Sequence, residues 1–282
     1  MASLAPTENI RRRIAGEVVA FFNDQAKGQA PIVRSPDALC PPGGVAWRVH
    51  GDVTGMIVGG VAALLLQMLH PKALAGVWDH SDFKANMHGR LRNTARFIAV
   101  TTYGARTEAE AAIARVRRIH DHVNGTLPDG TPYDANDPHL LAFVHIAGSA
   151  MFLAGWRRFG EPGMSAADRD RYWAEVAPIA RLLGAEPVPE TEADANALLT
   201  SYLGELRADT RSRTIRDIIL NAQPEQLRAV PLQALLMRAA IDLLPPVARR
   251  LHGLRSSGVG KPAIGAATFG LASTLRWALA PR

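Results

Sequence analysis

The sequence predicts an all-α protein, a single globular domain of many helices. Apolar residues recur at the three-and-four spacing of a helix face in most segments. No segment keeps the strict alternation of a strand. The 282 residues are 48% hydrophobic and 21% charged, and the 24 glycines and 19 prolines are scattered, so the chain is long and apolar enough for one large core.

Three regions are expected: an N-terminal helix and loop over 1–44, a main helical domain over 45–253, and a loop with an apolar C-terminal helix over 254–282. The predicted helices cover 7–26, 52–69, 84–103, 107–123, 138–159, 165–183, 190–206, 212–221, 224–243, 244–253 and 262–279.

Local signals support individual helices. The apolar run 55–69, GMIVGGVAALLLQML, ends before Pro71 and is shorter than the roughly 20 residues of a membrane span, so it is expected to be a buried core helix. Thr107 is the expected N-cap of the helix that follows Gly104. The segment NGTLPDGTPYDANDP is expected to be a turn-rich connector.

Charge, cysteine content and the N-terminal sequence argue against several classes of protein. The net charge of +6 and the pI of about 10 come from basic residues spread over the chain, with no block longer than RRR at 11–13, which favours a solvated basic surface over a nucleic-acid partner. One cysteine, Cys40, excludes an internal disulfide. Glu17 interrupts what would be the apolar core of a leader, so a cytoplasmic location is expected. The apolar tail 262–279 is expected to pack as a helix, or to contact a partner or, peripherally, a membrane surface.

Two histidines in RVRRIHDHVNG, 115–125, face opposite ways because two positions of a helix are about 200° apart. His120 lies in the apolar stripe of Ile113, Val116 and Val123, whereas His122 is expected in water. Arg117 is on the shoulder of the inward face. A buried core histidine bonded to a carbonyl and a metal ligand both explain His120.

The preceding helix carries Arg90 and Thr94 within an apolar stripe, whereas Arg92 and Arg96 face away. A buried arginine requires an anion, so a salt bridge to another helix and the carboxylate of a cofactor are both candidate partners.

A third helix carries His145 close to Gly148 and Ser149, which leave room for a helix or a flat ligand. His70 ends the apolar helix, and Asp79 and His80 are expected in a turn or cap. His50, His88, His139 and His252 fit no pattern and are predicted at the surface.

The order of the segments WRVHGDVTGMIVGGVAALLLQMLHP, GVWDHSDF, RLRNTARF, TTYG and VRRIHDHVNGTLPDGTPYDANDPHLLAFVH resembles the latex-clearing-protein (rubber oxygenase) and MpaB-type oxygenase family. The resemblance covers roughly residues 45–245 and is most specific from Val116 to His145. It implies an all-helical, oxygenase-like domain with heme b, which uses dioxygen to cleave double bonds in isoprenoid chains; many bacterial relatives are small soluble proteins of unknown activity.

The resemblance assigns roles to residues. It implies that His120 is the proximal iron ligand, that Arg117 lies near the heme, and that Arg90 and Thr94 stand beside it. His145, on the helix that leaves room for a flat ligand, is expected to be a further cofactor contact. The lysine of the family's Arg-x-x-Lys-Thr motif is Asn93 here. The region of the family's catalytic glutamate reads HPKALAGVW, without an acid.

The predicted function is therefore that of a heme-dependent oxygenase or oxidase for a hydrophobic small molecule, isoprenoid or aromatic, with Arg90, Asn93 and Thr94 at the reaction site. Two alternatives stay open: a heme-binding or hydrophobic-ligand-binding protein without turnover, and a heme-free helical enzyme that uses His70, His120 and His145, either as acid–base groups or as ligands of a non-heme metal.

Overall fold

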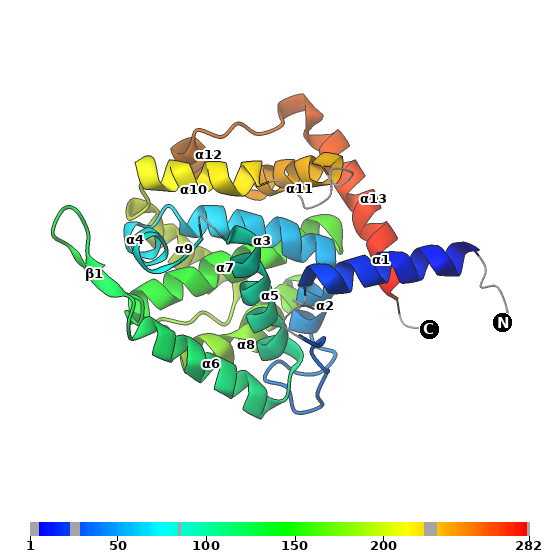
Figure 1. Cartoon of the computed structure of the whole chain (residues 1–282), viewed down its shortest axis with the longest axis horizontal. Helices are drawn as coiled ribbons and strands as arrows, with labels where there is room; N and C mark the ends of the chain where they lie inside the picture. Colours follow the sequence, from blue (N-terminus) through cyan, green and yellow to red (C-terminus); the bar gives the residue numbers. More distant parts are fainter. Residues whose placement is uncertain (1–5, 23–28, 84–85, 223–229, 281–282) are drawn as a thin grey trace.

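A computed structural model describes residues 6–22, 29–83, 86–222 and 230–280. The chain is 72% helical, which confirms the predicted all-α class (Figure 1). The helices in chain order are α1 (Pro6–Phe22), α2 (Val45–Gly51), α3 (Val53–Gln67), α4 (Pro71–His80), α5 (Met87–Tyr103), α6 (Arg106–His120), α7 (Pro138–Phe159), α8 (Ala166–Leu183), α9 (Glu192–Ser201), α10 (Thr210–Asn221), α11 (Val230–Leu243), α12 (Pro246–His252) and α13 (Lys261–Leu279), with 3-10 turns η2 (Tyr202–Gly204) and η4 (Gly258–Gly260).

Helices α3 and α7 cross the middle of the molecule and pack closely on each other (Figure 1). Glycines set this close approach: a Cβ added to Gly59 would lie 2.7 Å from the carbonyl oxygen of Met151, and one added to Gly155 would lie 2.7 Å from that of Gly55. The pairs run in opposite directions along the chain, so the two helices are antiparallel. An alanine at Gly59 or Gly155 would push the backbones apart.

Helix α7 begins at Pro138, behind the N-cap Asp137, and ends before Gly160, in agreement with the predicted range. By length and hydropathy it could cross a membrane, as could the bent pairs α2–α3 and α11–α12 if each were one span. In this fold 67% of its most apolar window is buried inside the protein. The central position of α7 therefore accounts for its apolar composition.

Two short helices beside the core differ from the sequence-based expectations. No helix was predicted over α2 or α4, and Asp79 and His80, expected in a turn or cap, belong to the last turn of α4. Glu175 of α8 explains α2: its buried carboxylate accepts the N–H of Ala46 at 2.7 Å and so caps a helix of only seven residues. This partner is 129 residues away in the chain, beyond the reach of a local pattern.

Helices α5 and α6 form a hairpin, and α6 also packs on α8. The N-cap of α6 is Ala105, so the prediction of Thr107 as its N-cap was wrong; Thr107 lies within the first turn. After α6, two three-residue strands, β1 (Asn124–Thr126) and β2 (Pro132–Asp134), pair antiparallel and project from the body (Figure 1). Strands this short carry no readable alternation, which is why this region was predicted to be a turn-rich connector without strands.

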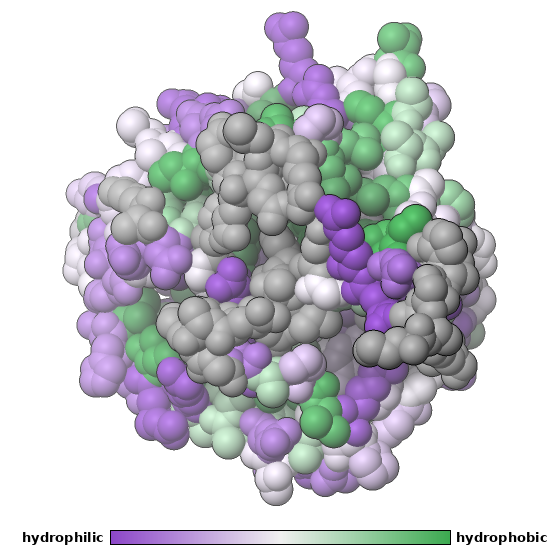
Figure 2. All heavy atoms as spheres, turned by 45° about the vertical axis from the view of Figure 1, so that its right-hand side comes forward, coloured by the Kyte–Doolittle hydropathy of each residue, from purple (hydrophilic) through white to green (hydrophobic). Residues whose placement is uncertain are grey.

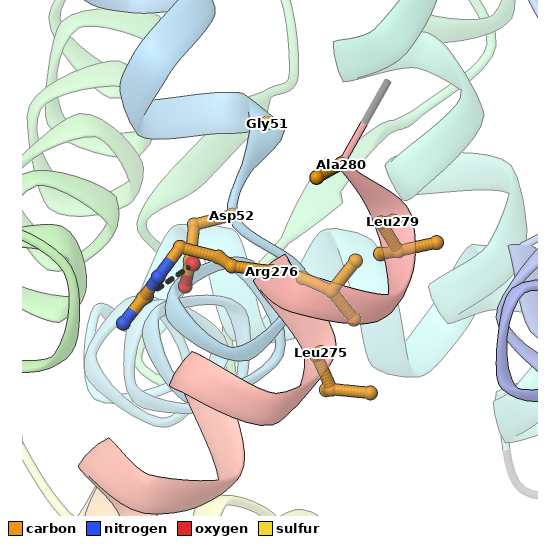
Figure 3. A pocket seen from close by; sticks show the side chains of 7 residues that line it. Gly51, Asp52, Leu275, Arg276, Leu279 and Ala280 are labelled. Carbon is orange, nitrogen blue, oxygen red and sulfur yellow. Dashed lines mark hydrogen bonds and ion pairs between the residues drawn. The ribbon is translucent and has the colours of Figure 1, made fainter. Parts of the chain in front are cut away.

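The predicted apolar tail forms α13, which packs on α1, α3, α7 and α11. Arg276 anchors it: its Nη1 lies 2.8 Å from Oδ2 of the buried Asp52 and also donates to the carbonyl of Phe159. Figure 3 shows this ion pair beside a cavity of about 150 Å³ between the α2–α3 junction and the end of α13. The other oxygen of Asp52 accepts a hydrogen bond from the N–H of Gly55 and caps α3. One carboxylate therefore links the start of α3 to α13.

Candidate functional site

The imidazole of His120 is turned inward at the C-terminal end of α6, as the helical stripe predicted. Ala109 and Ile113 on the same face are buried, whereas His122 is exposed. The Nδ1 atom of His120 is buried, and the structure shows no hydrogen-bond partner for it among the described residues. Burial lowers the pKa of His120, although the negative charge of Asp134 and a side-chain hydrogen bond between Asn136 and the ring oppose the shift. The ring is therefore neutral near pH 7, the form that binds metals.

Arg90 lies one turn into α5 and is partly buried. Burial alone lowers its pKa, and its guanidinium makes no hydrogen bond or ion pair with any residue that the structure describes. By contrast, Arg96 on the same helix donates to the carbonyl of Ala30 at 2.9 Å. A desolvated guanidinium without a counter-ion is costly, so Arg90 is the residue of α5 best suited to bind an anionic group.

Asn93 and Thr94, the other α5 candidates, are exposed, so the prediction that Thr94 shares an inward face with Arg90 was wrong. Arg92 and Arg96, predicted to face away, are partly buried, as Arg90 is. The hydroxyl of Thr94 donates back to the carbonyl of Arg90 at 3.1 Å, which is the usual local bond of a helical threonine. Their roles stay predictions from the resemblance.

Arg117 has a structural partner. It is exposed, and its Nη1 donates to the carbonyl of Leu182 at 3.3 Å, in the last turn of α8. The contact ties α6 to α8 one turn before His120. Arg117 thus positions the end of α6 in this structure, and its contact with a cofactor stays a prediction.

His145 on α7 faces Trp173 on α8, with ring centroids 6.3 Å apart at 78°. The Nε2 of His145 and the Nε1 of Trp173 are both buried without a described hydrogen-bond partner. Burial lowers the pKa of His145 to about 4, so this imidazole is neutral. Two polar atoms on these facing rings are therefore left without a hydrogen-bond partner among the described residues.

A buried hydrogen-bonded chain lies next to His145. The hydroxyl of Tyr172 donates to the carbonyl of Ser149, so it must accept a hydrogen bond from Nε2 of His50 at 3.0 Å. Because the neutral ring carries its hydrogen on Nε2, Nδ1 of His50 accepts from the hydroxyl of Thr102 at 2.8 Å. Burial lowers the pKa of His50 to about 3, so the ring is neutral near pH 7. A neutral ring has one donor and one acceptor nitrogen, as this order of hydrogen bonds requires. The chain connects α5, α2, α8 and α7.

The prediction that His50 and His252 lie at the surface was wrong. His50 takes part in the chain just described, and His252 is 1% exposed and bonds the carbonyl of Leu65 through Nε2 at 2.7 Å. Each is a single histidine on a seven-residue helix, too short for a periodic face. His139 is exposed as predicted, and the side chain of His88 lies outside the described part.

His70 belongs to a different cluster. It is buried, stacks on Phe143 and lies 3.1 Å from Glu205, whose other oxygen lies 2.9 Å from Nε2 of His139. It caps the start of α4 rather than ending α3. Within the described residues no three histidine, cysteine or acidic side chains are placed to bind a metal ion. This arrangement lends no support to the alternative of a non-heme metal held by His70, His120 and His145.

The remaining candidates lie on four helices that pack in sequence: α5 on α6, α6 on α8, and α8 on α7 (Figure 1). No hydrogen bond or ion pair joins the side chains of Arg90, His120 and His145 to one another in the described structure. Several apolar side chains of α5 are only half-buried, namely Leu91, Phe97 and Ile98. A second cavity, of about 320 Å³, lies elsewhere, between Arg181 and Leu198.

Residues 47–277 match the profile of the family described as ER-bound oxygenase mpaB/B'/Rubber oxygenase, catalytic domain. No curated protein and no solved structure matches the chain significantly. The matched range includes every candidate helix from α5 to α8 and extends into α13. The chain therefore belongs to the mpaB/rubber oxygenase family, as its segment order and inward-facing His120 suggested.

Proposed function

We propose that this protein is a heme b-dependent oxygenase that acts on a hydrophobic small molecule. Family membership gives the coarse function, an oxygenase with a small-molecule substrate and oxygen. The single observation that carries the heme proposal is the neutral imidazole of His120, half-buried on an otherwise apolar stripe, with an unpartnered ring nitrogen.

Two groups of the chain fit the two chemical features of heme b. A neutral imidazole suits the iron, and the unpaired guanidinium of Arg90 suits a propionate carboxylate. His120 would hold the iron and Arg90 would orient the porphyrin. When bound, the heme would supply the activation of dioxygen.

The chain's own residues would bind and orient the substrate. The half-buried apolar side chains of α5 suit a hydrophobic molecule. The Nε1–H of Trp173 would donate a hydrogen bond to an oxygen atom of the substrate. Nε2 of His145, on the facing ring, would form a second hydrogen bond with the same oxygen atom. The chain of Thr102, His50 and Tyr172 links α5 to α2 and α8.

The proposal does not extend to rubber cleavage. Asn93 replaces the lysine of the family motif, and a neutral amide supplies no charge. The segment HPKALAGVW has no carboxylate to abstract an allylic proton. We therefore propose oxygenase chemistry on another apolar substrate, of isoprenoid or aromatic character.

The test compares two histidines that are two residues apart. Protein produced with adequate heme supply is expected to show a Soret band and a pyridine hemochrome spectrum. His120→Ala should abolish both, because the inward imidazole is lost, whereas His122→Ala should keep them, because that ring is exposed.

Equal retention of heme in the two variants would contradict the assignment of His120. A wild-type protein without a Soret band would remove the heme proposal altogether. If heme binds but no candidate substrate stimulates oxygen uptake, the alternative of a heme carrier without turnover would be favoured.

A further inference from the structure

We propose that the side of the molecule formed by α1 and α13 docks on an anionic lipid bilayer. This inference goes beyond the proposed oxygenase function and does not depend on it. Large hydrophobic side chains are exposed here: Ile10 is 53% exposed, Phe269 41%, Trp277 46%, and Val259 is fully exposed in η4. We call these four residues the apolar patch.

Helix α13 carries two basic residues. Lys261 lies at its start, and Arg276 pairs with the buried Asp52 while its guanidinium lies 5.7 Å from the centre of the Phe269 ring. The other exposed positions of α13 carry only apolar, small or hydroxyl side chains, with Phe269 and Trp277 the largest. Exposed aromatic residues beside basic side chains are typical of helices that lie in the bilayer interface.

Basic residues lie next to the apolar patch at both ends of α13. Arg255 is exposed three residues before η4. On α1, Arg12 and Arg13 are exposed, and Arg11 stacks on Trp277 and donates to the carbonyl of Ala280. α1 and α13 pack together, so these charges lie beside the patch.

Figure 2 shows apolar residues gathered at the upper right of this side of the molecule, with strongly hydrophilic side chains next to them. This combination identifies the partner class. An acidic bilayer complements both the basic rim and the apolar centre, because lysine and arginine attract anionic head groups while tryptophan and phenylalanine enter the interface. A nucleic acid would leave the apolar centre unsatisfied. A two-fold pairing with a second copy would place basic rims against each other.

The experiment is co-sedimentation of the full-length protein with vesicles of pure phosphatidylcholine or of phosphatidylcholine and phosphatidylglycerol at a ratio of about 3:1. Binding is expected to be about tenfold stronger to the anionic vesicles and to weaken with salt, since each basic residue at the surface contributes about fivefold in affinity. The double variant Phe269→Glu, Trp277→Glu should lower binding at least about tenfold, and Arg12→Glu by about fivefold or more.

Ile119→Glu is the matched control, because Ile119 is 53% exposed on α6, outside the apolar patch, and should leave vesicle binding unchanged. Circular dichroism verifies that each variant is folded. A blue shift of tryptophan fluorescence on vesicle addition, absent in Trp277→Phe, would place that residue in the interface.

The proposal is overturned if wild-type protein fails to bind anionic vesicles, or if Ile119→Glu weakens binding as much as the patch variants. It is also overturned if light scattering shows a dimer that the patch variants dissociate while vesicle binding persists. None of these outcomes depends on heme, so they leave the oxygenase proposal untouched.

Discussion

At the scale of residues, a buried ring nitrogen without a described partner marks a candidate functional group but does not identify one alone, because Nδ1 of His70 and of His252, both outside the candidate site, is also buried without one. Every ring nitrogen of His50 is hydrogen-bonded, so this residue holds helices together. His120, His145 and Trp173 each keep a buried nitrogen without a described partner. Because an unsatisfied buried polar atom costs about 1–3 kcal/mol, such atoms persist where a ligand or water completes them.

Arg90 gives a prediction at this scale. Arg90→Ala should reduce heme content and the affinity for a hydrophobic substrate at least about tenfold, because a charge-assisted hydrogen bond contributes roughly 1.5–3 kcal/mol. The measurements are heme titration by absorbance and oxygen uptake with the candidate substrate. Arg92→Ala, two positions along α5, is the control and should change both by less than about twofold. Equal losses in the two variants would contradict the assignment of Arg90 as the anion-binding residue of α5.

At the scale of elements, single long-range contacts position whole helices. Glu175 caps α2, and Arg117 ties the end of α6 to α8. The ion pair of Arg276 with Asp52 attaches α13 to the start of α3 (Figure 3). The Asp52 side chain is 2% exposed and that of Arg276 32%. Loss of the arginine would therefore leave a buried carboxylate whose one remaining hydrogen-bond donor among the described residues is the N–H of Gly55.

Arg276→Leu should therefore destabilise the protein by about 2 kcal/mol, less than a fully buried pair would give, because the guanidinium is partly hydrated. Urea unfolding followed by circular dichroism measures the loss. Limited proteolysis should also cleave between α12 and α13 sooner. Arg255→Leu, which removes an exposed arginine, should stay within about 0.5 kcal/mol of wild type. An unchanged midpoint for Arg276→Leu would show that α13 is held by apolar contacts alone.

At the scale of the whole molecule, the buried histidines make stability depend on pH. In the folded protein the pKa of His50 is about 3 and that of His145 about 4, against 6.5 for an unperturbed histidine. Between these values the unfolded chain binds protons that the folded protein does not bind. Above pH 6.5 both states have neutral rings, and these histidines do not lower the free energy of unfolding. As the pH falls from 6.5 toward 4, proton binding by the unfolded chain lowers that free energy.

The free energy of unfolding should consequently fall below pH 6.5, by up to about 1.4 kcal/mol per pH unit for each of the two histidines. Urea titrations at pH 5 and pH 7 measure the difference. His50→Gln should make the profile flatter while lowering stability at pH 7, because the amide does not titrate. His122→Gln, at an exposed position, should keep the wild-type profile. Equal stability of the wild-type protein at pH 5 and pH 7 would refute the prediction.

Local sequence patterns were sufficient to predict the range of the long helix α7 and the inward direction of His120. The range of α7 follows from Asp137 and Pro138 at its start and Gly160 after its end, all neighbours in sequence. The inward direction of His120 follows from a 3.6-residue period across α6, which also distinguishes it from His122. The segment order was enough to indicate the family that residues 47–277 match.

Tertiary structure alone decided the partners of the buried polar groups. His50 with Tyr172, Glu175 with Ala46 and Asp52 with Arg276 are separated by 122, 129 and 224 residues. Helical periodicity tells which way a side chain points but not which element it meets, because the order of helices in space depends on packing the whole apolar core at once. For the same reason the sequence placed Arg90 on an inward face, and only the assembled helices showed that its guanidinium meets no acid among the described residues.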